Sequence, residues 1–442
     1  MRKLLIRLKW LFAGRGAIAG ALNTFAGRAL LLLVNLGTGI LSARLLGPTG
    51  RGELAVLGLW PTFLYGILTF GVPSAVRYQV RRDPEAATEL FSASLVLGGL
   101  LGVVAMIVGF VIIPHWDQQY SPSIIEFAQL MMLFTPTIAL QNMVQAFLES
   151  RERFGAASRM LYLPPMMTLV GFIGLYVTHH LTPRSVALSY MIPSVIVAGF
   201  SAWQIRSEIR YPRNFVRRSR QLLNYGSKAY GLDILGNVSG QVDQAIVIGL
   251  LTASSFGLYA VAINMSRILG IFQSSITTVL FPKASGLEPT EAIALVGRSA
   301  RITIPITFVA GLGFVLLVPF VIPLMYGRAY LPDIRLTQIL TAEVIIGSVT
   351  GVLTQAFMAT GRPGLITIFQ VGGMATSVPL MFIFIPRLGI TGAAYALLGA
   401  TIVRFVLVLL SYPVLLHHQI PQLVLTRQDV DDLRRRLRAV AA

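Results

Sequence analysis

The sequence predicts an all-α integral membrane protein with twelve transmembrane helices arranged in two six-helix lobes. Hydrophobic residues make up 55% of the 442 residues and charged residues only 12%, whereas a soluble protein carries about 25% charged residues. Twelve stretches are long and apolar enough to cross a bilayer, and two short sequence patterns occur twice along the chain. These observations exclude a soluble enzyme.

The spans are defined by apolar stretches that end at loop-forming residues. A helix that crosses a bilayer needs about 20 predominantly apolar residues, because it rises about 1.5 Å per residue. The breaks carry turn-forming residues, as at 47–50 (GPTG) and 361–364 (GRPG). The twelve predicted spans cover residues 24–46, 53–76, 90–113, 124–147, 159–178, 185–205, 229–251, 256–281, 300–324, 335–358, 364–386 and 390–416.

The amino-terminal segment precedes the first span. Its 16 residues combine five basic residues with an apolar stripe, which predicts an amphipathic cytoplasmic helix on an anionic lipid surface. A signal peptide is the alternative, but Arg7, Lys9 and Arg15 would interrupt its apolar core. The predicted domains are this helix at 1–16, an N-lobe at 17–205, a basic cytoplasmic linker at 206–228, a C-lobe at 229–416 and a basic cytoplasmic tail at 417–442.

The basic residues predict the orientation in the membrane. With the amino terminus in the cytoplasm and residues at span ends assigned to the adjoining segment, 27 of the 36 Lys and Arg residues fall in inside segments, 6 in outside segments and 3 deep within spans. The positive-inside rule therefore places both termini in the cytoplasm. The same distribution argues against nucleic-acid binding, because the basic residues are spread over many loops and form no binding motif.

An internal repeat relates the two lobes. Residues 43–56 (ARLLGPTGRGELAV) match residues 248–261 (IGLLTASSFGLYAV) at an offset of 205, and residues 145–147 match residues 355–357 (both QAF) at an offset of 210. A repeat of six spans is even, so the halves are parallel repeats with the same orientation. Two such bundles predict a central cavity between the lobes and an alternating-access carrier.

Six charged residues lie at least four residues inside the ends of predicted spans. There a charge costs about 2.5–3.5 kcal/mol and usually faces a partner or a water-filled cavity. The guanidinium group is a planar fork of donors that suits phosphate, so the arginines predict a site for an anionic substrate. We interpret the carboxylates as ion-coupling groups or as structural ion-pair partners. The six residues are Arg28, Arg267, Arg404, Asp233, Asp243 and Glu343.

Purely structural roles stay open for these residues. Arg28 lies close enough to the cytoplasmic boundary to extend its side chain to the headgroups. Asp233 and Asp243 could hydrogen-bond neighbouring helices. Glu343 could simply neutralise one of the two deeper arginines.

The sequence contains little that would indicate a metal site or an enzyme active site. The chain has no cysteine, and its five histidines lack metal-ligand spacing, so we expect neither a disulfide nor a metal site. A Gly-rich phosphate loop with Lys and a nucleophile–base pair are both missing, so we expect no ATP site, no cofactor and no enzyme activity. A membrane-embedded glycan polymerase or ligase is a distant alternative, although such an enzyme typically has a large outside loop.

Six short motifs follow one another along the whole chain, mostly at the ends of spans. They are ARLLGPTGRG at 43–52, FGVPSA at 70–75, GLYAVA at 257–262, LFPK at 280–283, QAFMATGRP at 355–363 and GITGAA at 389–394. In this series the chain resembles the polysaccharide or O-antigen flippases of the multidrug/oligosaccharidyl-lipid/polysaccharide exporter superfamily. Each motif is unspecific, and the resemblance depends on their order and spacing.

The resemblance implies translocation of an undecaprenyl-pyrophosphate-linked oligosaccharide from the inner to the outer face of the bacterial cytoplasmic membrane. It also implies a cationic central cavity, for which Arg28, Arg267 and Arg404 are the candidates. The expected partners are this substrate, anionic membrane lipids and a polymerase or export protein of the same pathway, with the carrier itself a monomer. A cation-coupled multidrug exporter and a lipid II flippase of the same superfamily are the alternatives.

Overall fold

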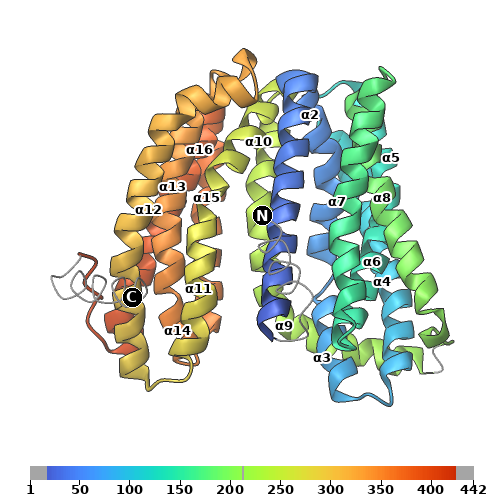
Figure 1. The fold of residues 1–442 in the computed structure, drawn as a ribbon, viewed down its shortest axis with the longest axis horizontal. Helices are drawn as coiled ribbons and strands as arrows, with labels where there is room; N and C mark the ends of the chain where they lie inside the picture. Colours follow the sequence, from blue (N-terminus) through green and yellow to red (C-terminus); the bar gives the residue numbers. More distant parts are fainter. Residues whose placement is uncertain (1–16, 212–213, 425–442) are drawn as a thin grey trace, which may run out of the picture. The chain divides into compact units, whose positions relative to one another are not determined.

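The computed structural model describes residues 17–211 and 214–424, with the side chains of all of these except 17–30, 32, 229, 231–239 and 279. Every regular element in the described ranges is helical (Figure 1). The amphipathic helix predicted at 1–16 and residues 425–442 of the predicted tail lie outside the described residues. The all-helical fold predicted from the sequence is confirmed for the described part of the chain.

The chain forms two compact units, which divide within helix α9 (Phe215–Leu250). The first contains the residues up to Pro114 and Pro122–Ala229, and the second contains His115–Ser121 and the residues from Tyr230 onward. Most of the predicted linker is therefore part of α9, because this helix already begins at Phe215. The predicted lobe boundaries at 205 and 229 stay predictions.

The remaining helices follow chain order within each unit. The first unit contains α2 (Ala17–Leu68), α3 (Val72–Arg82), all but the last two residues of α4 (Ala87–Trp116), α5 (Pro122–Met131), η1 (Met132–Phe134), α6 (Thr135–Ser150), α7 (Phe154–Val177), α8 (Pro183–Gln204) and η2 (Arg206–Glu208). The second contains α10 (Ala253–Arg267), α11 (Gly270–Ala284), α12 (Pro289–Met325), η3 (Arg328–Tyr330), α13 (Asp333–Leu353), α14 (Gln355–Ala359), α15 (Gly364–Leu388), α16 (Ile390–Ser411) and η4 (Tyr412–Leu416).

The break predicted between the first two spans lies inside α2. Gly47 has φ 68° and ψ 178°, a non-helical conformation that glycine adopts without the penalty other residues meet. Pro48 follows and has no N–H group to continue the helical hydrogen bonds. The residues before and after Gly47 are therefore separate helices joined at a kink, as the sequence predicts.

Eight helices of the described chain are long and apolar enough to cross a membrane, or up to ten if each of two bent pairs is one span. The bent pairs are Leu33–Leu68 with α3, at 51°, and α10 with α11, at 41°. The protein is therefore a multi-pass membrane protein, but the predicted count of twelve is not confirmed. The predicted span 229–251, in α9, is not among these helices, and the predicted span 24–46 overlaps only the start of Leu33–Leu68. Both predicted spans include residues whose side chains are outside the described part of the chain.

Each unit has its own apolar core, and the repeated QAF pattern contributes to both. Phe147 in α6 is fully buried and stacks on Phe91 at 4.0 Å between ring centroids. Phe357 in α14 is also fully buried and meets the ring of Tyr412 edge-on at 5.3 Å. Each copy of the pattern therefore places a phenylalanine in the apolar core of its unit.

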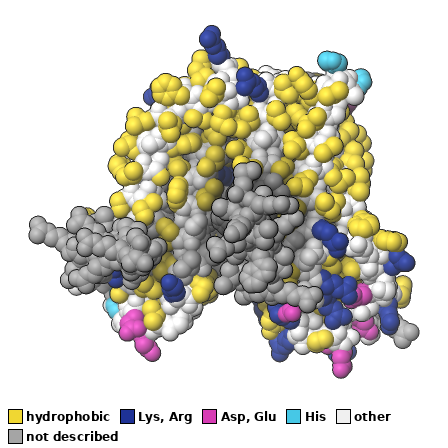
Figure 2. All heavy atoms as spheres, viewed as in Figure 1, with side chains coloured by type: hydrophobic (Ala, Val, Ile, Leu, Met, Phe, Trp, Pro, Cys, Tyr) yellow, Lys and Arg dark blue, Asp and Glu magenta, His cyan; other side chains and the backbone are white. Residues whose placement is uncertain are grey.

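The surface also has the character of a membrane protein. Hydrophobic side chains cover most of the visible face of each unit, whereas charged side chains gather at one end of the first unit (Figure 2). Among the ion pairs of the first unit, Arg77 of α3 contacts Glu149 at 2.6 Å, and Arg81 of α3 pairs with Glu152. Large apolar side chains such as Phe320, which is 73% exposed, suit a lipid environment.

Candidate functional site

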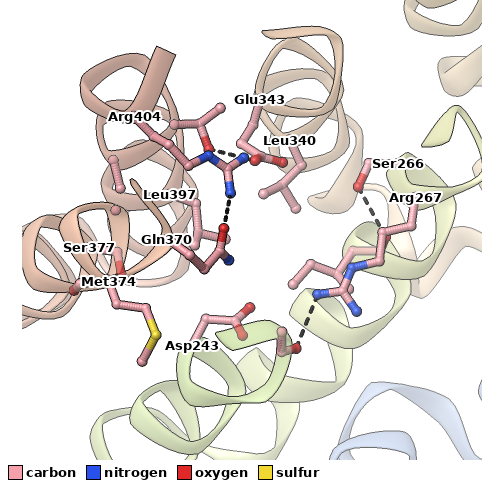
Figure 3. Close-up of a pocket in the computed structure, with 15 residues that line it drawn as sticks. Asp243, Ser266, Arg267, Leu340, Glu343, Gln370, Met374, Ser377, Leu397 and Arg404 are labelled. Atoms are coloured by element: carbon pink, nitrogen blue, oxygen red, sulfur yellow. Dashed lines mark hydrogen bonds between the residues drawn. The ribbon is translucent and has the colours of Figure 1, made fainter. Parts of the chain in front are cut away.

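Four of the six charged residues predicted inside the membrane line one pocket of the second unit (Figure 3). Asp243 comes from α9, Arg267 from α10, Glu343 from α13 and Arg404 from α16, and α15 adds Gln370. The pocket has a volume of about 370 Å³, which falls within the range of about 300–1,000 Å³ that is usual for ligand sites. We call it the acidic pocket, because the carboxylates of Asp243 and Glu343 both line it.

The other two predicted residues have side chains outside the described part of the chain. Arg28 is carried by α2 before its kink, and Asp233 by α9 just after the point where the two units divide. Their roles in binding and ion coupling stay predictions.

Arg267 is placed by the end of a helix. It is the last residue of α10, after which Ile268 and Leu269 separate this helix from α11. Its Nη2 atom donates a hydrogen bond to the carbonyl oxygen of Gly240, at 3.2 Å. A guanidinium group has five N–H donors, so most of this group remains available to a ligand in the pocket.

Arg404 and Glu343 lie beside each other but do not form an ion pair within 4.0 Å. Nη1 of Arg404 donates to Oε1 of Gln370 at 2.8 Å, and its buried Nε atom has no hydrogen-bond partner among the described residues. Oε1 of Glu343 instead accepts a hydrogen bond from Thr401 at 2.7 Å. Neutral side chains thus hold both charges, so the positive charge of Arg404 is not cancelled by direct contact with a described carboxylate.

Asp243 is a buried carboxylate with one satisfied oxygen. It is 5% exposed, and the hydroxyl of the fully buried Tyr259 donates to its Oδ2 atom at 2.7 Å. Its Oδ1 atom has no partner among the described residues. A buried charge needs compensation by opposite charge or hydrogen bonds, and Arg267 in the same pocket supplies positive charge.

A second pocket of about 370 Å³ shares four lining side chains with the acidic pocket. These four are Arg267, Glu343, Gln370 and Arg404, which we call the polar layer. Every other residue that lines the second pocket is uncharged, so we call it the neutral pocket. The polar layer therefore lines both pockets of the second unit.

Sequence reasoning missed the uncharged members of the site. Gln370, Tyr259 and Thr401 hold the charged groups, yet none of them carries a charge that stands out in an apolar stretch. Gln370 does lie within the predicted span 364–386, so an amide inside a span was the available signal. Among the described residues, no group of three or more His, Asp or Glu could hold a metal ion.

A family model described as polysaccharide biosynthesis protein matches residues 41–335, which is more than half of the chain. The chain belongs to this family. The resemblance inferred from the sequence motifs is thereby confirmed. A comparison with curated proteins finds no match.

Solved structures show the fold that this member of the polysaccharide biosynthesis family adopts. The lipid II flippase MurJ, in an inward closed conformation, is similar with a TM-score of 0.72 at 18% identity, over 89% of this chain and 87% of that one. An inward-facing multidrug resistance MATE family transporter of the MOP superfamily has a TM-score of 0.70 at 16% identity, over 93% and 99%. The family member described here therefore shares the fold of these transporters.

Proposed function

We propose that the protein is a flippase that moves an undecaprenyl-pyrophosphate-linked oligosaccharide from the inner to the outer face of a bacterial cytoplasmic membrane by alternating access. Membership in the polysaccharide biosynthesis family is the observation that carries this proposal. The transporter fold and the arginine-containing pocket of the second unit support it. The protein acts as a carrier without a cofactor and makes or breaks no covalent bond in its substrate.

The arginines supply the chemistry that a pyrophosphate needs. Each charge-assisted hydrogen bond contributes about 1.5–3 kcal/mol, so several together offset much of the cost of removing the pyrophosphate from water. Arg267 and Arg404 face the same pocket, and Arg28 is proposed to add a third guanidinium. Lys would keep the charge but lose the planar fork of donors.

Replacing Arg28, Arg267 or Arg404 with Ala should abolish surface glycan while the protein stays in the membrane, and Lys should restore export in part. Glycan is measured on intact cells with a lectin or antibody, and protein level by immunoblotting of membranes. Arg387→Ala is the matched control, because Arg387 is exposed and lines neither pocket. Normal export by a triple-Ala variant that is present at normal level would overturn the binding role of the arginines.

The carboxylates are proposed to couple transport to an ion gradient. Asp243 and Glu343 line the acidic pocket beside the arginines, and Asp233 lies ten residues before Asp243 on the same helix. If they bind and release a proton or cation, Asn or Gln at these positions should abolish the pH or ion dependence of transport in proteoliposomes. Unchanged transport and unchanged pH dependence in all three variants would leave the carboxylates as structural groups.

A cation-coupled multidrug exporter is the second candidate function. The observation that favours it is the buried Oδ1 atom of Asp243, an acceptor without a partner among the described residues in a pocket that could take a cation. This candidate predicts that expression in a drug-sensitive host raises resistance to organic cations and that Asp243→Asn removes the effect. Surface glycan would then be independent of the protein. If the protein is instead a lipid II flippase, it should restore peptidoglycan synthesis in cells that lack their own lipid II flippase.

A further inference from the structure

The neutral pocket has uncharged hydrogen-bonding groups that a pyrophosphate does not require. The substrate of the proposed function has two parts, a charged pyrophosphate and an uncharged oligosaccharide covered with hydroxyl groups. The two arginines of the polar layer suit the first part, and the rest of the neutral pocket offers hydrogen-bonding groups without further charge. The following inference rests on the proposed function and assigns a role to this second space.

Glycines on α13 make room for an amide in the neutral pocket. Gly347 and Gly351 are four residues apart, so both face the pocket from the same side of the helix. A Cβ atom at Gly351 would overlap the Nε2 atom of Gln273, whose side chain lies against the bare backbone there. The absence of a side chain at position 351 therefore sets where the amide of Gln273, with its donors and acceptor, sits in the pocket.

Two hydroxyl groups line the same space. Thr350 donates its proton to the carbonyl oxygen of Ile346 at 2.8 Å, and Thr354 donates to that of Gly351, also at 2.8 Å. Each hydroxyl oxygen keeps lone pairs that can accept hydrogen bonds from a ligand. Ile366 of α15 also lines the pocket and offers apolar contact for the carbon face of a sugar ring. A small number of fixed polar groups on a largely apolar wall is the usual composition of a ligand site.

We infer that the neutral pocket is a glycan subsite, in which Gln273, Thr350 and Thr354 hydrogen-bond sugar hydroxyls while the polar layer holds the pyrophosphate. A pocket of about 370 Å³ takes only part of a longer oligosaccharide, so the sugars nearest to the pyrophosphate occupy it. The subsite makes the protein selective for a sugar-bearing lipid over a bare lipid pyrophosphate, because unmatched polar groups in the site weaken binding of the bare form.

The test compares two probes on the purified full-length protein by native mass spectrometry. One probe is undecaprenyl pyrophosphate, and the other is the pool of undecaprenyl-pyrophosphate-linked glycans extracted from membranes of the strain that carries the gene. The wild type should bind the glycan-bearing probe more tightly. Gln273→Ala and Gly351→Ala should each weaken that binding about three- to tenfold, the effect of one or two lost hydrogen bonds, and leave the bare probe unchanged. Arg404→Ala should weaken the binding of both probes.

Two matched variants control for packing. Gln355 donates to the carbonyl oxygen of the same Gly351, at 3.3 Å, but does not line the pocket, so Gln355→Ala should bind both probes like the wild type. Gly372 lies on α15 outside the pocket, and a Cβ there would meet Leu407 at 3.1 Å, so Gly372→Ala controls for an added methyl group. Because Gly351→Ala acts by displacing the amide, combining it with Gln273→Ala should add no further loss.

The outcomes separate this inference from the proposed function. If Gln273→Ala and Gly351→Ala bind the glycan-bearing probe like the wild type, or bind both probes more weakly to the same extent, the neutral pocket is not a glycan subsite. The flippase proposal then still stands. If the wild type binds neither probe, the proposed function fails, and the subsite with it. A glycan-specific loss in both variants, with both controls unaffected, supports the subsite.

Discussion

At the scale of single residues, the second unit stabilises charge mainly with neutral partners. Arg404 is held by the Gln370 amide, Glu343 by the Thr401 hydroxyl and Asp243 by the Tyr259 hydroxyl. Such bonds position a charge without cancelling it, whereas a direct ion pair would consume the donors that a ligand needs. The site therefore keeps charged groups oriented and available inside a membrane-spanning unit.

The bond between Tyr259 and Asp243 gives a direct test of this arrangement. Tyr259→Phe removes the only hydrogen bond that the Asp243 carboxylate accepts from a described side chain, so it should lower the free energy of unfolding by about 1–3 kcal/mol. Thermal unfolding of the purified protein in nanodiscs, followed by tryptophan fluorescence, measures the change. Asp243→Asn combined with Tyr259→Phe should cost less than the sum of the two single changes. Equal stability of Tyr259→Phe and the wild type would contradict the prediction.

Sequence reasoning found the charged members of the site for a physical reason. A charge in an apolar span is expensive and therefore conspicuous, so Arg267, Arg404, Asp243 and Glu343 could be selected without a structure. The resemblance to the flippase family placed the arginines in one cavity, but which carboxylates share a pocket with them could not be predicted, because that depends on how separate helices pack. The same applies to the choice of Gln370 as the partner of Arg404.

At the scale of helices, the join between α2 and α3 depends on backbone conformation. Phe70 and Gly71 have φ values of 47° and 67°, and the two helices are bent by 51°. Gly71 also lies against the backbone of Gly226 in the first part of α9, where a Cβ would come within 2.5 Å of the Gly226 carbonyl oxygen. The predicted span 53–76 runs across this bend, because an apolar stretch does not reveal where its helix changes direction.

Gly71→Ala should therefore destabilise the first unit. The substitution combines an unfavourable positive φ with overlap against main-chain atoms. We therefore expect the free energy of unfolding to fall by about 1–3 kcal/mol and the yield of folded protein to fall as well. Size-exclusion chromatography and thermal unfolding of the purified variant measure both effects. Gly58→Ala is the matched control, because no atom lies within 4 Å of its added Cβ and alanine favours a helix by about 0.5–1 kcal/mol. Similar behaviour of the two variants would show that the close approach at Gly71 is unimportant.

At the scale of the whole molecule, composition predicted the class of protein and the internal repeat predicted its two halves. The all-helical multi-pass fold and the family are confirmed, because long apolar stretches and ordered motifs are visible along the chain. The count of spans was harder to predict. Helix α9 carries polar residues along much of its length, and α2 combines two predicted spans in one kinked element.

The topology of the chain can be tested without a structure of the membrane-embedded protein. The excess of 27 basic residues inside over 6 outside predicts that both termini face the cytoplasm. A fluorescent reporter fused after Ala442 should be active in the cytoplasm, and alkaline phosphatase inserted within 116–122 should be active outside. An odd number of predicted spans separates the two insertion positions, so the twelve-span topology places them on opposite sides of the membrane. A result that puts both on the same side would contradict the twelve-span topology.

The depth of the polar layer gives it an electrical consequence. Glu343 is ten residues beyond Asp333, the start of α13, and Arg404 is fourteen beyond Ile390, the start of α16. At 1.5 Å per residue they lie about 15–21 Å along helices that cross about 30 Å of hydrocarbon, so both are at intermediate depth. An elementary charge that moves halfway across the membrane changes its energy by about 1.1 kcal/mol per 100 mV. If the protein carries the anionic substrate of the proposed function from the cytoplasm, a negative cell interior therefore draws that substrate toward this layer.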